Sequence, residues 1–202
     1  MPKVFVVGPD YSIRNMFLRA GWTISTSIDE TVNLIQFTGG EDVDPSYYKE
    51  TKHPKTYSNP RRDAAEAAIF HEWKAKIAMA GICRGGQFLN VMNGGSMWQD
   101  VNNHAIGGTH EAFDRVSELP VQVTSTHHQM MIPASHGKVL LTAELATRRE
   151  TADTIVEGLD TDTEAVLYLD TNCLCFQPHP EYVNINHECQ VLYFKYLDRF
   201  LL

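Results

Sequence analysis

The sequence predicts an α/β fold: a three-layer sandwich in which helices cover both faces of a mostly parallel central sheet. Strand-like and helix-like segments alternate through the first half of the chain, which is typical of a parallel sheet. Alternating apolar and polar residues between Phe113 and Val123 indicate additional antiparallel strands. The chain is then expected to end with one more strand followed by a helix. We expect a single domain over residues 1–202, since this length allows one sizeable core.

Short apolar runs in the first half predict four strands, at residues 3–8, 22–26, 32–37 and 77–82. Three helices are expected between and after them. Ser12 is a suitable N-cap for the first helix, which ends near Ala20. Alanine-rich residues 61–74 predict the second. The third follows Cys83, because apolar residues then recur at helical spacing: Phe88, Leu89, Val91 and Met92.

The second half predicts loops, further strands and a last helix. Residues 46–60 and 102–112 are polar and read as irregular surface loops. Strands are expected at residues 139–143, 165–169 and 172–177, with an exposed hairpin region over 146–163. Asn186 is expected to cap a C-terminal helix. The apolar positions of that helix are expected to be buried to differing degrees: Val191, Leu192, Phe194, Tyr196, Leu197 and Phe200.

The composition argues against several classes of protein. A formal net charge of −8, from 17 basic and 25 acidic residues, does not suit a general nucleic-acid-binding surface. No apolar run is long enough to span a membrane, and the first residues lack the layout of a signal peptide. The four cysteines form no CxxC motif and indicate no disulfide framework. A cytoplasmic location is therefore expected.

The most informative stretch is an apolar run that ends at Ile82, turns sharply at Cys83 and continues as a helix. Gly81, Gly85 and Gly86 flank the turn, where strand and helix backbones must approach closely. This is the layout of a nucleophile elbow, with cysteine in place of serine. The positive end of the helix favours a thiolate, which is the reactive form of cysteine. The alternative is an ordinary buried core cysteine.

A cysteine nucleophile needs a base, and the base needs a group that fixes its tautomer. His179 and Glu181 lie two residues apart in an extended segment, so their side chains point to the same side. Pro178 and Pro180 restrict the backbone around His179. We expect His179 to meet Cys83 at the carboxyl ends of sheet strands. The alternative is that residues 179–181 are only the polar end of a strand and have no catalytic role.

Several motifs together resemble one known family. Residues 81–87, Gly-Ile-Cys-Arg-Gly-Gly-Gln, are similar to the GxCxGxQ elbow of class I glutamine amidotransferases. Four further stretches resemble the peptidase C26 branch of that superfamily: residues 37–45, Arg62-Asp63, His127-His128-Gln129 and residues 177–181. That branch contains γ-glutamyl-γ-aminobutyrate hydrolases and folate γ-glutamyl hydrolases. The resemblance covers most of the chain and implies the flavodoxin-like sandwich of the class I glutamine amidotransferases.

The resemblance also implies roles for individual residues. Cys83 would be the nucleophile, His179 the general base and acid, and Glu181 the carboxylate that orients His179. The backbone N–H groups of Gly40 and Arg84 would form the oxyanion hole. The substrate would be held by Gly39, Gln87, His127, His128 and Gln129. No cofactor is implied.

The chain departs from the family pattern in three places. It is shorter than typical members around residues 46–60 and 102–120, where substrate loops lie. Pro178 stands where an aromatic residue is usual, and Gly86 stands where a larger apolar residue is common. The first departure leaves the leaving-group amine open, whereas the other two concern packing behind the triad.

Three functions are compatible with these residues. The first is a cysteine-dependent hydrolase that cleaves a γ-glutamyl amide bond through a glutamyl thioester. The second is a glutaminase subunit that delivers ammonia from glutamine to a separate synthetase partner. The third is a non-catalytic binding protein on the same fold. Neither a nucleic acid nor a membrane is an expected partner, and the sequence does not determine the oligomeric state.

The nine histidines raise the question of a metal site. His127 and His128 are adjacent, so an extended chain points them to opposite sides. The sequence contains no HxH, HExxH or CxxC motif. We therefore expect no native metal ion. Cys173, Cys175 and Cys189 are expected to be core residues.

Overall fold

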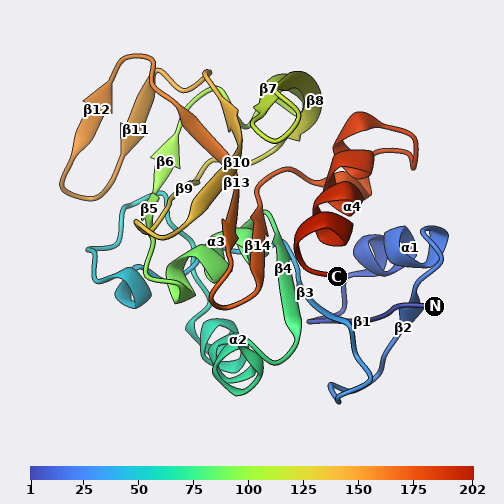
Figure 1. Cartoon of the computed structure of the whole chain (residues 1–202). Helices are drawn as coiled ribbons and strands as arrows, with labels where there is room; N and C mark the ends of the chain where they lie inside the picture. Colours follow the sequence, from blue (N-terminus) through green and yellow to red (C-terminus); the bar gives the residue numbers. More distant parts are fainter.

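The computed structural model describes residues 1–202 and has one large central sheet (Figure 1). Nine strands form this sheet in the order β2-β1-β3-β4-β14-β13-β10-β7-β8. Five neighbouring strands are parallel: β2 (Thr23–Ile24), β1 (Lys3–Val6), β3 (Leu34–Phe37), β4 (Ala78–Ile82) and β14 (Cys173–Phe176). Strands β3, β4 and β14 are buried at every position, as expected for parallel strands covered on both faces.

The other four strands extend the sheet in antiparallel fashion: β13 (Asp162–Tyr168), β10 (Lys138–Ala143), β7 (Gly108–Asp114) and β8 (Leu119–Ser125). The prediction of an irregular loop over 102–112 is wrong in its second part, because β7 already begins at Gly108. The hydrophobic signal was absent there because the first residues of β7 are exposed. Their backbone groups pair with β8 all the same.

Two small sheets lie beside the central one. The first pairs β5 (Ser96–Trp98) with β9 (Met130–Ile132). The second contains β6 (Asp100–Val101), β11 (Arg148–Glu150) and β12 (Ile155–Glu157). Strands β11 and β12 form the hairpin expected between residues 146 and 163, and β12 is exposed at every position.

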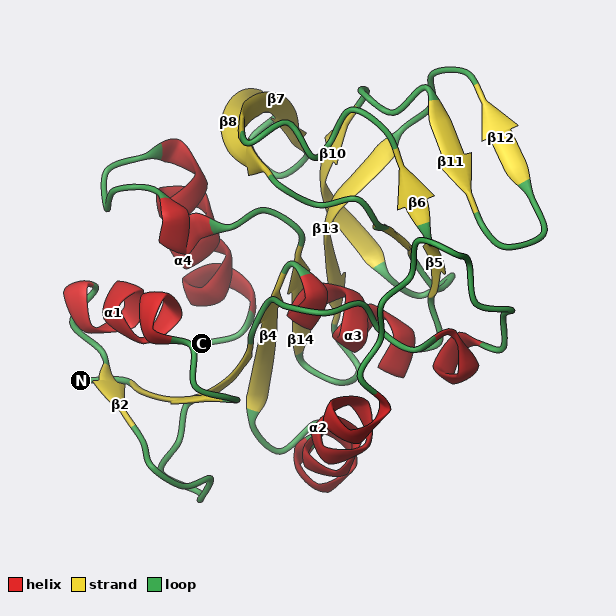
Figure 2. Ribbon diagram, turned by 180° about the vertical axis from the view of Figure 1, so that it is seen from behind, coloured by secondary structure: helices red, strands yellow, loops and turns green.

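Helices cover both faces of the central sheet (Figure 2). Helices α1 (Tyr11–Arg19) and α4 (Glu188–Phe200) pack into one core, whereas α2 (Pro60–Trp73) and α3 (Arg84–Met92) pack into a second core on the opposite face. Two short 3₁₀ turns occur at Pro45–Tyr48 and Pro180–Tyr182. The predicted three-layer α/β sandwich is confirmed. None of the four α-helices combines the length and apolar character needed to cross a membrane.

The structure corrects two helix starts. Asp10, not Ser12, caps α1, because its Oδ1 accepts the backbone N–H of Ile13 at 2.9 Å. His187, not Asn186, caps α4 through a bond from the backbone N–H of Cys189. In both helices a neighbouring residue has the extended backbone and the acceptor that an N-cap needs.

Candidate active site

Cys83 forms the turn between β4 and α3 in a strained conformation. Its backbone φ of 50° and ψ of −114° are values that residues other than glycine rarely adopt. The turn is tight, since a Cβ added to Gly81 would lie 2.2 Å from the backbone of Gly85. A Cβ on Gly86 would lie 2.8 Å from the backbone nitrogen of Phe176. The expected need for small residues at this elbow is confirmed, and Gly86 cannot be enlarged without moving β14.

The elbow presents Cys83 at the start of α3. The thiol is half-buried, and the backbone N–H of Cys83 donates to the carbonyl of Phe176 at 2.8 Å. The first N–H groups of a helix lack intrahelical partners and carry partial positive charge. The N–H of Arg84, the first residue of α3, is therefore available beside the sulfur.

His179 is fixed by three contacts directly after β14. Its Nδ1 lies 2.6 Å from Oε1 of Glu181, whose side chain is 1% exposed. Its backbone N–H donates to Oγ1 of Thr124 at 2.6 Å. Its ring stacks on Tyr182 with 4.3 Å between the ring centroids. Because Nδ1 faces the carboxylate, Nε2 is the nitrogen left for a reacting group.

Gly39 shows how closely the two catalytic candidates approach. A Cβ built on Gly39 would lie 3.1 Å from Cε1 of His179. It would lie 3.9 Å from both Cβ of Cys83 and Nε2 of His179. The carboxyl ends of β3, β4 and β14 therefore bring these three residues together.

The electrostatics of His179 favour an imidazolium. Burial lowers its pKa, but interactions with Cys83 and Glu181 outweigh burial and raise the pKa to about 10. An imidazolium next to a cysteine is the ionic partner that cysteine nucleophiles use. His179 therefore places an acid beside the candidate nucleophile.

Arg62 holds the loop that contains Gly39 and Gly40. Its Nη2 donates to the carbonyls of Thr38 and Gly39, both at 2.9 Å, and its Nη1 pairs with Glu41 at 3.0 Å. Gly40 has a φ of 133°, and a Cβ there would lie 2.3 Å from Nη1 of Arg62. The loop can thus keep its backbone in this conformation only with glycine at that position.

The Arg84 side chain points away from the thiol into a buried ion-pair network. Its guanidinium contacts the carboxylates of Asp63 and Glu66 and lies over the ring of Phe88, 5.0 Å from the centroid. Glu66 also pairs with Arg62 at 2.8 Å. Glu66 is a further residue of this network that was not predicted from the sequence. Its place one helical turn after Arg62 on α2 was the available signal.

The candidate substrate residues Gln87 and Gln129 are buried and connected to each other. Nε2 of Gln87 donates to the backbone carbonyl of Gln129 and to Oε1 of Gln177, both at 3.2 Å. Nε2 of Gln129 donates to Oγ1 of Thr56 at 3.1 Å and to the carbonyl of Gln99 at 3.0 Å. These amides therefore position the segment around residue 129 against α3.

His127 and His128 point in different directions, as expected. The His127 ring is buried, with Nε2 3.5 Å from Oε1 of Glu164. His128 is 39% exposed in its side chain, and its Nε2 lies 3.2 Å from Oδ1 of Asp42. The bond to Asp42 raises the pKa of His128, against the opposing effect of partial burial. Of this pair, only His128 is available to a ligand.

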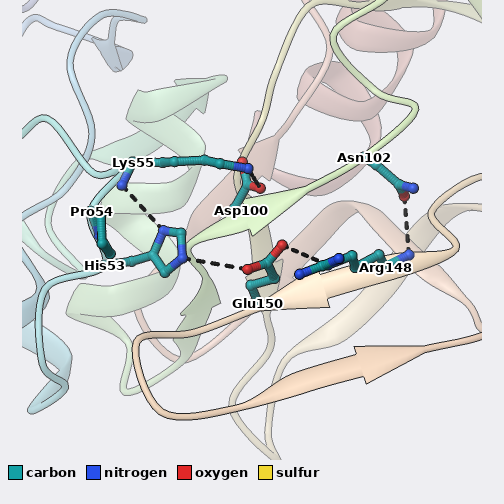
Figure 3. A pocket seen from close by; sticks show the side chains of 7 residues that line it. All are labelled: His53, Pro54, Lys55, Asp100, Asn102, Arg148 and Glu150. Carbon is teal, nitrogen blue, oxygen red and sulfur yellow. Dashed lines mark hydrogen bonds and ion pairs between the residues drawn. The ribbon is translucent and has the colours of Figure 1, made fainter.

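A polar cavity of ≈ 470 Å³ adjoins His128 through Asp100, whose Oδ1 lies 3.6 Å from Nδ1 of His128. Figure 3 shows the residues that line this cavity. No hydrophobic side chain lines it. In Figure 3, His53 and Arg148 both point toward Glu150, and Lys55 reaches Asp100. The complete lining is His53, Pro54, Lys55, Asp100, Asn102, Arg148 and Glu150. This polar lining suits a ligand that carries polar or charged groups.

Known proteins resemble this chain in sequence and in structure. Residues 20–181 match the family model Peptidase C26. Protein NtpR of Enterococcus hirae is 42% identical over 84 residues, which are 41% of this chain and 35% of NtpR. A Mycobacterium tuberculosis protein described as a "putative glutamine amidotransferase" is 30% identical over 171 residues, which are 75% of this chain and 51% of that protein. The crystal structure of a Thermotoga maritima glutamine amidotransferase has a TM-score of 0.64 at 17% identity, covering 98% of this chain and 83% of that one.

These likenesses differ in what they establish. The alignments span 35% of the length of NtpR and 51% of the M. tuberculosis protein. The structural match at 17% identity establishes the fold. The family model covers most of the chain, including the elbow and the segment of His179 and Glu181. The chain therefore belongs to the peptidase C26 family, a branch of the class I glutamine amidotransferase-like superfamily.

Proposed function

We propose that this protein is a glutamine amidotransferase-like hydrolase that cleaves a γ-glutamyl amide bond. The observation that carries the proposal is the meeting of Cys83, His179 and Gly39 at the ends of three parallel strands. Family membership supports it as well. In this proposal the substrate is glutamine or a γ-glutamyl amine, and its glutamyl part lies near Gly39, Gln87 and His128.

The reaction would begin with attack of the Cys83 thiolate on the γ-carbonyl carbon. The oxyanion that forms would accept hydrogen bonds from the backbone N–H groups of Gly40 and Arg84. The C–N bond would break as His179 gives its Nε2 proton to the leaving amine. This step leaves a glutamyl thioester on Cys83. Glu181 would hold the His179 ring in the correct tautomer throughout.

The second half of the reaction would reverse the role of His179. Its neutral Nε2 would take a proton from water as the oxygen attacks the thioester carbonyl. The C–S bond would then break, releasing glutamate and restoring the thiolate beside the imidazolium.

The free thiols of the chain fit a reducing compartment, and we place the enzyme in the cytoplasm on that ground.

The test is release of glutamate from glutamine and from a panel of γ-glutamyl amines by the purified protein alone. We expect turnover, and an acid-quenched sample should carry a glutamyl mass increase on the peptide that contains Cys83. Cys83→Ala should abolish both signals. Cys173→Ser is the matched control, because this buried thiol donates only to the carbonyl of Thr171, at 3.4 Å. Full turnover by Cys83→Ala would contradict the proposal.

A glutaminase subunit is the second candidate, supported by the description of the M. tuberculosis relative. In that case ammonia would pass to a separate synthetase partner. Ammonia release from glutamine would then rise strongly when that partner is added, whereas the isolated chain would turn over slowly. No turnover with any substrate or partner, and no thioester on Cys83, would favour a binding protein instead.

A further inference from the structure

Four buried residues form a cluster that the proposed reaction does not use. His104 precedes β7, His110 lies in β7, His127 follows β8, and Glu164 lies in β13. Their side chains are between 0% and 3% exposed. We refer to these four residues as the histidine–glutamate cluster. The antiparallel half of the sheet brings it together from distant parts of the chain.

The distances in the cluster fit a tetrahedral metal site. Oε1 of Glu164 lies 3.3 Å from Nδ1 of His104, 3.3 Å from Nε2 of His110 and 3.5 Å from Nε2 of His127. Zinc bonds of about 2.0–2.1 Å separate the ligands of a tetrahedron by about 3.3 Å. Donor atoms of His104, His110 and Glu164 all lie within 4.8 Å of one another. The three nitrogens thus surround one carboxylate oxygen at the spacing of zinc ligands.

The cluster is also where unpartnered polar atoms concentrate. Eleven buried side-chain nitrogen and oxygen atoms of the chain lack a hydrogen-bond partner, and six of them belong to these four residues. They include both oxygens of Glu164 and both ring nitrogens of His110. None of the three contacts to Oε1 has the geometry of a hydrogen bond. The carboxylate of Glu164 has only the three imidazole rings near it, and a buried carboxylate without hydrogen bonds is costly, so a cation bound among them would compensate it.

Two of the rings are already oriented for metal binding. Nε2 of His104 lies 2.9 Å from Oδ2 of Asp162, and Nδ1 of His127 lies 2.9 Å from the backbone carbonyl of Gln129. Since a carbonyl oxygen can only accept, Nδ1 of His127 carries a proton, and in the neutral ring Nε2 then offers its lone pair on the side of Glu164. Ligand histidines commonly bind a carboxylate or carbonyl through their second nitrogen in this way.

We infer that the histidine–glutamate cluster binds a divalent transition-metal ion, with zinc as the best match. Donor atoms of His104, His110 and Glu164 lie close enough together to bind one ion, and we assign Nε2 of His127, which faces the same oxygen of Glu164, as the fourth ligand. A buried site whose four positions are all filled by the protein is a structural site. The carbonyl of Gln129 accepts from both His127 and Gln87 of α3. A bound ion would therefore brace the segment that packs against the catalytic helix, while taking no part in the chemistry.

The test is metal content and stability of the full chain purified without a polyhistidine tag. Elemental analysis should find about one zinc ion per chain, as a single site requires. Removal by a chelator should lower the melting temperature. Zinc at about a thousandfold above its dissociation constant should raise it again by about 10 °C. Replacement by cobalt should give the visible absorption bands of a tetrahedral site.

Variants locate the ion. His110→Gln and Glu164→Gln should bind zinc at least about tenfold more weakly than the wild type. His53→Gln is the matched control, since it removes another buried histidine that lies 3.5 Å from a glutamate. Cys83→Ala should keep its zinc, which separates this site from the catalytic thiol.

Three results would overturn the inference. One is a wild type that stays metal-free after zinc addition with an unchanged melting temperature, a readout that does not require the variants to fold. Another is equal zinc affinity in His110→Gln and His53→Gln. The last is zinc that disappears in Cys83→Ala but remains in Glu164→Gln. None of these results depends on whether the protein hydrolyses γ-glutamyl amides.

Discussion

At the scale of single residues, His179 carries the strongest electrostatic signal of the candidate site. Its pKa is raised to about 10, above the ordinary value of 6.5, by Cys83 and Glu181 against the effect of burial. A pKa that is higher in the folded than in the unfolded state means that folding stabilises the charged ring, and this adds to the stability of the protein wherever the ring is protonated. The contribution is fully present below pH 6.5 and is lost as the pH rises through about 10.

Cys83→Ala tests this directly. Without the thiol, only Glu181 remains of the two groups that raise the pKa of His179, so we expect this pKa to fall below the wild-type value. NMR titration of the His179 ring should show the shift. The free energy of unfolding of wild type and variant should differ below pH 6.5 and converge above pH 10. An unchanged titration midpoint in Cys83→Ala would mean that the thiol and the ring do not interact.

At the same scale, the sequence was sufficient for close pairs but not for distant ones. The contact between His179 and Glu181 was predictable because the two residues share one extended segment. The histidine–glutamate cluster was not, because its residues come from three separate parts of the chain, 104–110, 127 and 164, and produce no spacing motif. His127 shows the difference. Its burial depends on β13, which lies far away in the chain.

At the scale of elements, the elbow depends on how closely α3 approaches the sheet. A Cβ on Gly86 would lie 2.8 Å from the nitrogen of Phe176 and 3.1 Å from the carbonyl of Gly81. Both atoms belong to the backbone, so neither can move away by a change of side-chain rotamer. The absence of a side chain at Gly86 therefore sets the distance between α3 and β14.

We expect Gly86→Ala to destabilise the chain by about 1–3 kcal/mol, the usual cost of overpacking. Urea unfolding followed by circular dichroism measures the difference. Gly108→Ala is the control, since a Cβ there meets nothing within 4 Å, and it should change stability by less than about 0.5 kcal/mol. Equal effects of the two substitutions would show that the elbow tolerates a wider separation.

At the scale of the whole molecule, topology explains why the fold was easier to predict than its details. Alternating strands and helices fix a parallel sheet, and Cys83 and His179 both follow strands of that sheet. Their proximity follows from the pairing of β4 with β14. The order of the nine strands and the start of β7 could not be read locally. They depend on backbone pairing between segments far apart in the chain.

The same architecture separates one accessible thiol from three protected ones. Cys83 is half-buried at the sheet edge, whereas Cys173, Cys175 and Cys189 are fully buried in the two cores. Burial raises the pKa of Cys173 to about 11 and that of Cys189 to about 12, and it also raises the pKa of Cys175 well above its ordinary value. Such thiols form little thiolate at neutral pH and are reached by few reagents.

We therefore expect a thiol reagent at neutral pH to modify one cysteine rapidly in the native protein and the other three only on unfolding. Peptide mapping should identify the fast site as Cys83. The rate at the three slow sites should rise with urea in parallel with global unfolding, because they lie on both faces of one sheet and become exposed only when it opens. A second cysteine that reacts rapidly in the native protein, or a slow reaction at Cys83, would contradict the division into one accessible and three buried thiols.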